Sequence, residues 1–443
     1  MARWKAILVV LGVAIVAVAV PVAVGAVGAM SAARGVYPER ADAVSLAHTE
    51  PAHDPTKPTV AIVVGPTGAN IADTLAPFEV LAGTGAFNVY TVAPTMRAIT
   101  LTGGLDLVPQ LDFAGLDRLL GHSPDAVIVP ALPGAGGRDT AVVEQWLTRQ
   151  RADGLPVVAS ICVGAEVLAS AGILDDRPAT AHWLGLIGLR RDYPDVGWRN
   201  GVRYVDDGDV ITSAAVLSGV DIALRIIERT RGTAMAQAAA HRVSWPGYTA
   251  GRSARMSQSG LSPADSVALL SAAYRWDRGD VGVLLSDGVG EIELAAAFRP
   301  YTELSYLAEP LAMSAGSQAV TTRHGLTVVP RAGTDADVDR VIVPGTDAAA
   351  RRIADGQIDE RSVTYLNDEP GFAFDGALRD IARTYDAATA RWVAKSMQYP
   401  DTGVELAGPA WPWRLTVRPL LLAVTVVVIA MLVTALVVQR RRS

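Results

Sequence analysis

The segment 157-VVASICVGAEVLASAGILDDRPATAHW-183 decides the fold, because it has the pattern of a buried strand, a tight bend and a helix in succession. Small residues, Ser160 and Gly164, stand two positions before and two positions after Cys162. A sharp strand-to-helix turn requires small residues there, since side chains would collide where the backbone doubles back. The amides and dipole at the start of the helix would lower the pKa of the thiol toward neutrality. The alternative is an ordinary buried cysteine, which is common in protein cores.

Strand-like runs alternate with helix-like runs around this segment. Helical patterns occur at "AVVEQWLTRQRA" (141–152) and "GVDIALRIIERT" (219–230). The β-branched runs that end at Gly or Pro are "TVAIVVG" (59–65), "FNVYTVAP" (87–94), "DAVIVPALPG" (125–134) and "DVITSAAV" (209–216). This alternation predicts an α/β fold in which helices cover both faces of a parallel sheet.

Residues from about 280 onward repeat parts of the preceding sequence in the same order. The blocks are "GLDLVP" (104–109) and "GLTVVP" (325–330), "DAVIVP" (125–130) and "DRVIVP" (339–344), and "DIALRIIER" (221–229) and "DGALRDIAR" (375–383). The second set lacks the stretch that holds Cys162 and His182. We therefore interpret it as a truncated copy that packs, binds or regulates. Chance similarity between Ala/Val-rich segments is the alternative.

Two uncharged apolar runs, 6–30 and 419–438, bracket the chain. At about 1.5 Å per residue, each can cross a hydrocarbon core about 30 Å thick. Basic residues precede the first run and follow the second, so the positive-inside bias predicts a protein of the cell membrane with both termini cytoplasmic and an extracytoplasmic body. The alternative for the first run is a cleaved signal peptide, whose apolar stretch is usually shorter.

The formal net charge of −6 bears on the class of partner, and the single cysteine bears on how the fold is stabilised. An acidic body argues against nucleic acid as a partner, because phosphate backbones are bound by clustered Lys and Arg. One cysteine excludes an intrachain disulfide, so the exported part must be held together by its core. We expect a small-molecule substrate or ligand and the membrane as partners, and neither a metal nor a cofactor.

The segment 159–183, "ASICVGAEVLASAGILDDRPATAHW", resembles the pattern "VCTGxxxLAxAGLLxGRxATTHW" of the DJ-1/PfpI superfamily. The similar branch contains class I glutamine amidotransferase-like domains, isocyanide hydratases and the sensor domains of AraC-type regulators. "DTLAPFEVLA" (73–82) resembles the "DxxGPxEVF" element of that branch, which places Asp73 and Glu79 at its two acidic positions. The resemblance covers Thr59 to about Met256. It implies a flavodoxin-like three-layer sandwich with a nucleophile elbow.

By this resemblance Cys162 is the expected nucleophile, and Glu79 is expected to join it as a catalytic residue. Asp73 is expected to hydrogen-bond Cys162 as a protonated or proton-sharing group and to deliver that proton during turnover, because two adjacent anions repel each other and one must stay protonated. His182 is expected to assist as a base or an orienting group, and the backbone amides of Gly134 and Val163 to hold a developing oxyanion.

This sequence departs from the pattern of that branch at several positions. Val163 stands where the branch usually has Thr, whose hydroxyl contributes to the site of the hydratases, so this departure argues against hydratase activity. Ala76 replaces a glycine of the pattern. The truncated copy, residues 279–400, has an acid, Glu293, at the position that corresponds to Asp73, and Arg299 at the position that corresponds to Glu79. It lacks the elbow.

Two functions fit these residues. The first is a membrane-anchored, cysteine-dependent hydratase or hydrolase acting on a small electrophilic substrate. The second is a non-catalytic sensor or scaffold in which Cys162 registers a small ligand or its own oxidation. The truncated copy is expected to cover the first as an intramolecular pseudo-dimer, with a homodimer as the alternative.

The expected organisation follows from these segments. We call residues 59–256 the first half and residues 279–400 the second half. The expected parts are an N-terminal transmembrane helix or signal anchor (1–30), a tether (31–58), the DJ-1/PfpI-like first half, a linker helix (257–278), the truncated second half, a juxtamembrane segment (401–414) and a C-terminal transmembrane helix (415–438).

Overall fold

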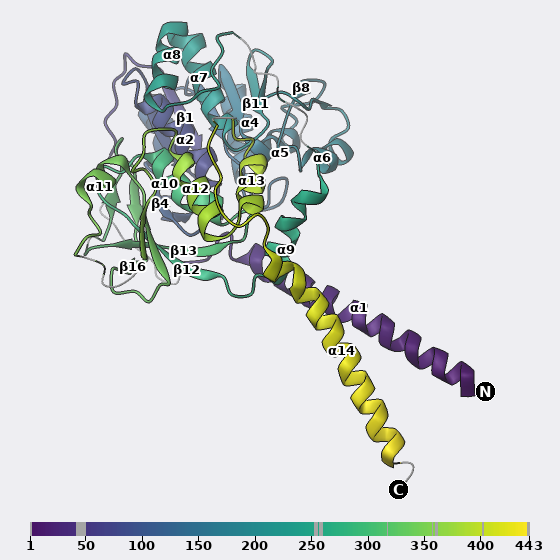
Figure 1. Cartoon of the computed structure of the whole chain (residues 1–443). Helices are drawn as coiled ribbons and strands as arrows, with labels where there is room; N and C mark the ends of the chain where they lie inside the picture. Colours follow the sequence, from purple (N-terminus) through teal and green to yellow (C-terminus); the bar gives the residue numbers. More distant parts are fainter. Residues whose placement is uncertain are drawn as a thin grey trace.

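A computed structural model describes residues 2–40, 50–251, 256, 260–316, 318–356, 358, 362–400 and 403–440. The predicted tether therefore lies partly outside the described residues. The body is built around two mainly parallel sheets, and two long helices extend away from it (Figure 1).

The first half contains a seven-stranded sheet in which all neighbouring strands are parallel except the edge pair β10–β11. β1 and β2 are buried along their whole length, as expected for central strands covered on both faces. This is the predicted flavodoxin-like α/β sandwich. The strand order is β10 (Tyr204–Asp206), β11 (Val210–Ser213), β7 (Val157–Ser160), β6 (Ala126–Val129), β1 (Thr59–Val63), β2 (Asn88–Ala93) and β5 (Leu111–Asp112).

Helices connect these strands and cover the sheet. α2, α7 and α8 pack against one another in one covering layer, and α4 packs against α5. The helices of the first half are α2 (Ile71–Ala82), α3 (Phe113–Leu120), α4 (Ala141–Ala152), the 3-10 turn η1 (Cys162–Gly164), α5 (Ala165–Ser170), α6 (Leu186–Asp192), α7 (Ser218–Arg231) and α8 (Thr233–Arg242). A short parallel pair, β8 (Pro178–Ala179) and β9 (Gly197–Trp198), lies apart from the sheet.

The second half contains a five-stranded sheet in which every pair is parallel. Its order is β16 (Ala332–Gly333), β13 (Ala308–Ser314), β12 (Gly279–Leu284), β17 (Arg340–Val343) and β18 (Ser362–Tyr365). In chain order this is the arrangement of β5, β2, β1, β6 and β7 in the first sheet. Within the described residues the second sheet ends at β18, whereas the first continues with β11 and β10. The helices here are α10 (Glu291–Phe298), η3 (Arg299–Tyr301), α11 (Thr346–Arg351), α12 (Phe374–Thr384) and α13 (Ala387–Ser396).

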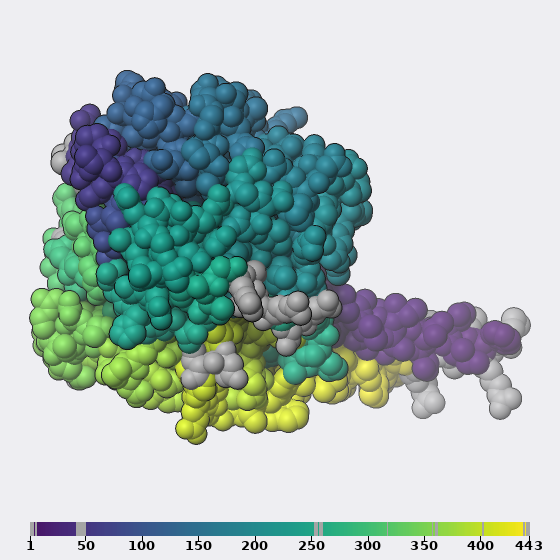
Figure 2. All heavy atoms as spheres, turned by 90° about the horizontal axis from the view of Figure 1, so that it is seen from above, coloured from purple at the N-terminus to yellow at the C-terminus, as the bar shows by residue number. Residues whose placement is uncertain are grey.

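The two halves form one packed unit. α2 packs against α10, and a single hydrophobic core includes Ile62 and Phe78 from the first half and Phe298 and Phe374 from the second. In Figure 2 the green and yellow atoms of the second half lie directly against the blue and teal atoms of the first.

A four-stranded sheet also joins the halves, in the order β14 (Val320–Thr321), β15 (Thr327–Val329), β4 (Asp106–Val108) and β3 (Ile99–Thr100). β15 and β4 are antiparallel, and Val328 lies opposite Leu107 at the centre of the pairing. Beside this sheet, Arg331 of the second half and Arg40 both form ion pairs with the buried Asp106 carboxylate, at 2.8 and 2.7 Å.

Two helices, α1 (Ala2–Arg34) and α14 (Trp413–Arg440), leave the body on the same side and diverge (Figure 1). Their segments Ile7–Arg34 and Trp413–Leu436 are long and apolar enough to cross a membrane. Both pack against α9 (Ser266–Tyr274) near the body, and the Tyr274 hydroxyl donates to the Pro21 carbonyl at 3.0 Å. The two helices are consistent with membrane anchoring.

We predict that Asp106→Ala destabilises the junction between the halves. The substitution leaves Arg331 and Arg40 without their shared buried carboxylate, and removing one partner of a buried ion pair costs about 3 kcal/mol. Chemical unfolding of the detergent-solubilised protein measures this loss. Asp192→Ala, which removes an exposed ion pair with Arg191, is the matched control and is expected to leave stability unchanged. Equal stability of Asp106→Ala and the wild type would contradict the prediction.

Candidate functional site

The bend after β7 places Cys162 at the carboxyl end of the first sheet. Cys162 has a φ of +59°, a left-handed conformation that non-glycine residues seldom adopt outside strained sites. At Gly164 an added Cβ would lie 2.4 Å from the Val129 carbonyl oxygen and 2.5 Å from the Pro130 carbonyl oxygen, so only glycine fits against the end of β6. The strand, bend and helix expected from the sequence are therefore present.

The Asp73 side chain is completely buried in the first turn of α2. Asn70 caps this helix, and its Oδ1 accepts hydrogen bonds from the amides of Ala72 (3.0 Å) and Asp73 (3.2 Å). The Ala131 amide donates to Asp73 Oδ2 at 3.0 Å, whereas Asp73 Oδ1 has no hydrogen-bond partner among the described residues, so the expected hydrogen bond to Cys162 is not present there. Burial raises the pKa of Asp73 well above its usual range, and the amide hydrogen bond does not offset this. Burial therefore favours the protonated carboxyl, and Oδ1 is the oxygen left to carry the proton, because Oδ2 accepts the amide.

The pKa of the Cys162 thiol is raised, which corrects the expectation of a thiolate near neutrality. Burial is the main cause, and the negative charge of Glu303, together with that of Asp73 whenever it is ionised, adds to it. A hydrogen bond from the Val163 amide and the positive charge of Arg299 act in the opposite direction but do not compensate. The expectation counted the favourable helix start but not the loss of solvent around a residue that is only 6% exposed. Burial therefore favours the neutral form of both the Cys162 thiol and the Asp73 acid.

The backbone amides of Val163 and Gly134, which were expected to hold an oxyanion, differ in their surroundings. The Val163 amide faces the sulfur, since it forms the hydrogen bond that lowers the thiol pKa. Gly134 lies in the loop after β6 with a φ of +69°, and its carbonyl accepts from the Gly137 amide at 3.0 Å. Its role as an oxyanion donor stays a prediction.

His182 is held by the second half rather than by the thiol. Its Nε2 lies 2.7 Å from the Ser396 carbonyl oxygen, and its Nδ1 accepts the Leu184 amide at 3.4 Å. The imidazole is therefore the neutral tautomer with the proton on Nε2, and burial lowers its pKa. Since both ring nitrogens are engaged elsewhere, the expectation that His182 acts as a base toward Cys162 is not supported by this geometry.

Glu79 belongs to a different cluster. The Ile292 amide donates to Glu79 Oε2 at 2.6 Å, and Arg323 forms an ion pair with Oε1 at 3.3 Å, so both contacts come from the second half. Burial, followed by the nearby charge of Glu291, raises the pKa of Glu79 to about 7. The expectation that Glu79 joins Cys162 is therefore not supported, although the two acids of the motif share one helix.

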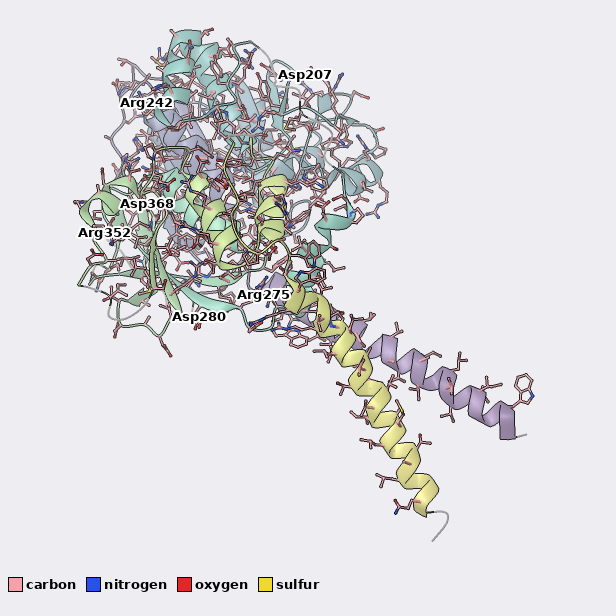
Figure 3. All side chains as sticks on the ribbon, viewed as in Figure 1. Asp207, Arg242, Arg275, Asp280, Arg352 and Asp368 are labelled. Atoms are coloured by element: carbon pink, nitrogen blue, oxygen red, sulfur yellow. The ribbon has the colours of Figure 1, made fainter. Side chains whose placement is uncertain are left out.

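Glu79 lines a cleft of about 370 Å³ between the halves. Glu293 of the same cleft accepts hydrogen bonds from the amide (2.8 Å) and hydroxyl (2.7 Å) of Thr346, just after β17, as Asp73 accepts an amide just after β6. Asn367, the second residue after β18, is buried there and accepts the Gly345 amide at 2.9 Å. Two charged residues that line the cleft are labelled in Figure 3, Arg242 and Asp368.

Two residues near the thiol were missed by the sequence reasoning, Arg299 and Glu303. Both belong to the second half, and their charges act on Cys162, Asp73 and His182. A signal was present in the segment 295-AAAFRPYTE-303, where an arginine and a glutamate four residues apart follow an apolar helix. Nothing in this segment indicates which surface of the first half Arg299 and Glu303 contact.

Comparison with known proteins identifies the family. The DJ-1/PfpI family model matches residues 58–229. Isonitrile hydratase of Pseudomonas putida is 30% identical over 175 residues, which cover 37% of this chain and 69% of the hydratase. The chain belongs to the DJ-1/PfpI family.

Two transcriptional regulators and a solved structure also match this chain. The HTH-type transcriptional regulator GlxA of Rhizobium meliloti is 29% identical over 174 residues, which cover 38% of this chain and 50% of the regulator. The chain spans half or less of the two regulators that it matches. The crystal structure of a ThiJ/PfpI family protein from Pseudomonas syringae is 24% identical, with coverage of 44% of this chain and 79% of that one and a TM-score of 0.37.

We predict that Cys162 alkylates with a midpoint above pH 8.5, the ordinary value for cysteine. Cys162 is the sole cysteine, so iodoacetamide labelling followed by mass spectrometry reports it without background. Asp73→Asn is expected to lower the midpoint, because an amide cannot take on the negative charge with which a deprotonated Asp73 opposes ionisation of the thiol. His182→Gln is the control and is expected to leave the midpoint in place. A wild-type midpoint at or below the ordinary value would contradict the prediction.

Proposed function

We propose that this DJ-1/PfpI protein hydrates a small, uncharged electrophile of the isonitrile type by covalent addition to Cys162. Two observations carry the proposal. The backbone of Cys162 is in a left-handed conformation at the bend, and the buried Asp73 carboxyl, whose Oδ1 has no partner among the described residues, lies within electrostatic range of the thiol. The similarity to isonitrile hydratase of Pseudomonas putida supports the choice of substrate class.

The proposed reaction needs no redox change. The Cys162 sulfur forms a bond to the terminal carbon of the isonitrile while Asp73 Oδ1 gives its proton to that carbon, and the thiol proton passes to Asp73. The product of this step is a thioimidate on Cys162. Water then adds to the same carbon, the C–S bond breaks, and the thiol is regenerated with release of a formamide. Asp73 carries the proton in both steps.

Burial favours an uncharged substrate. A charged molecule would lose its hydration in a site where the thiol and the acid are both neutral, and burying an uncompensated charge is strongly unfavourable. The Val163 amide, which faces the sulfur, is the group best placed to stabilise negative charge that develops there.

A sensor is the second candidate function, and the connections of the site to α1 and α14 favour it. Tyr37, three residues after α1, accepts a hydrogen bond from Thr102 (3.2 Å) and lies within the electrostatic reach of Asp73. His182 is bonded to α13, which precedes α14. In this function, ligand binding or oxidation at Cys162 would change how the two helices are held.

The second half is proposed to be a truncated copy that serves as a built-in partner. The shared strand order, the antiparallel pairing of β4 with β15 and the packing of α2 on α10 support this proposal. A homodimer is then not needed to complete the body.

The body is proposed to lie outside the cytoplasm, with α1 and α14 as membrane anchors. Basic residues precede the apolar run of α1 and follow the apolar run of α14. This placement supports the proposed orientation.

Hydration is tested by incubating the detergent-solubilised protein with small aliphatic isonitriles and measuring formamide by NMR. Cys162→Ser is expected to abolish turnover, and Asp73→Asn to reduce kcat by at least about 10²-fold, because the proton carrier is lost. Glu79→Gln, on the same helix, is the matched control and is expected to keep the wild-type kcat. The proposal would be contradicted if Cys162→Ser produced formamide at the wild-type rate, or if the wild-type protein produced no formamide.

The orientation is tested by labelling engineered cysteines in a Cys162→Ala background on intact cells. Leu261→Cys, at a body position that is 74% exposed, is expected to react with a membrane-impermeant maleimide. Gln439→Cys, at the far end of α14, is expected to react only after lysis. The reverse pattern would overturn the proposed topology.

A further inference from the structure

Arg299 carries a guanidinium that is only 1% exposed. It lies where α10 continues into η3, and its Nε forms an ion pair with Glu303 Oε2 at 3.0 Å. The Arg299 Nη1 also donates to the Glu303 carbonyl oxygen. Because a buried charge is costly unless it is paired, Arg299 holds Glu303 in a defined position.

Glu303 in turn contacts the first half at the helix that carries Asp73. Asn70 Nδ2 donates to Glu303 Oε2 at 2.6 Å. The opposite end of the same amide, Asn70 Oδ1, accepts the Ala72 and Asp73 amides. One side chain therefore connects the second half to the first turn of α2.

The thiol is surrounded by charged and titratable groups from several elements. Asp73 comes from α2, Arg299 and Glu303 come from the second half, and all three charges act on Cys162. Tyr37, after α1, and His182, after α5, respond to the same Arg299 and Glu303 charges. Glu303 disfavours and Arg299 favours ionisation of both Asp73 and Cys162.

We propose that Arg299 and Glu303 are positioning residues of the Cys162 site, supplied by the second half: Arg299 orients Glu303, and Glu303, through Asn70, fixes the turn that presents Asp73. The two halves then build one site: the second half, although it has no thiol, holds the turn that carries Asp73 and places two opposite charges within range of Cys162. The inference rests on the proposed role of Cys162 and Asp73 but not on the identity of the substrate.

Arg299 and Glu303 carry opposite charges, so removing each charge is expected to shift the reactivity of Cys162 in opposite directions. A purely structural role of the two residues predicts no such opposite shifts. In full-length protein in detergent, the iodoacetamide reaction rate of Cys162 is measured against pH for Glu303→Gln, Arg299→Gln and Arg299→Lys. Below the midpoint the rate follows the thiolate fraction, in which half a pKa unit is about a threefold change. Glu303→Gln keeps an oxygen for Asn70 and removes the charge, so its rate is expected to rise at least about threefold. Arg299→Gln leaves Glu303 unpaired, so its rate is expected to fall by about the same factor.

Two further variants separate charge from packing. Arg299→Lys keeps the positive charge and is expected to stay near the wild-type profile. Arg331→Gln also cuts an ion pair between the halves, with Asp106, and is expected not to move the profile. If Arg299→Gln does not fold, Glu303→Gln and Arg299→Lys still decide the question.

Parallel shifts in Glu303→Gln and Arg299→Gln, or no shift in Glu303→Gln, would overturn the inference. Isonitrile turnover is measured separately on the same proteins. Absence of turnover in the wild type refutes the proposed reaction without affecting the alkylation result, so the two failures are distinguishable.

Discussion

The Asp73 carboxyl has lost its contact with solvent and, among the described residues, has gained a single hydrogen bond, from the Ala131 amide. One amide does not replace the hydration of a carboxylate, so burial favours the protonated side chain. The same burial favours the neutral Cys162 thiol. The proposed chemistry depends on this constraint, because it uses an acid and a thiol rather than two ions and a substrate without charge.

The contacts between α2 and α10 link the halves in both directions. Glu79 of α2 accepts the Ile292 amide of α10, and Arg299, at the end of α10, lies with Glu303 next to the first turn of α2. Each half thus places a charged group beside the polar cluster of the other. Glu79 and Arg299 carry opposite charges, so the two clusters are chemically different.

Sequence reasoning predicted the parts of the site that depend on local pattern. The elbow at Cys162, the acid at Asp73 and the α/β sandwich all follow from runs of a few adjacent residues, and the structure contains them. The prediction of a lowered thiol pKa was wrong, because that pKa depends on burial of the thiol by segments that are distant in the sequence. The partners of His182 and Glu79 could not be predicted, because they are Ser396 and Ile292, more than two hundred residues away in the chain.

Difference infrared spectroscopy of the protein at neutral pH against its Asp73→Asn variant tests the central claim most directly. A protonated carboxyl in an apolar setting has a C=O stretch that is separate from the bands of carboxylates. The account predicts that this C=O band is present in the wild type and lost in the variant. A difference spectrum with only carboxylate bands would show that Asp73 is ionised, and the neutral pair on which the proposed chemistry depends would not exist.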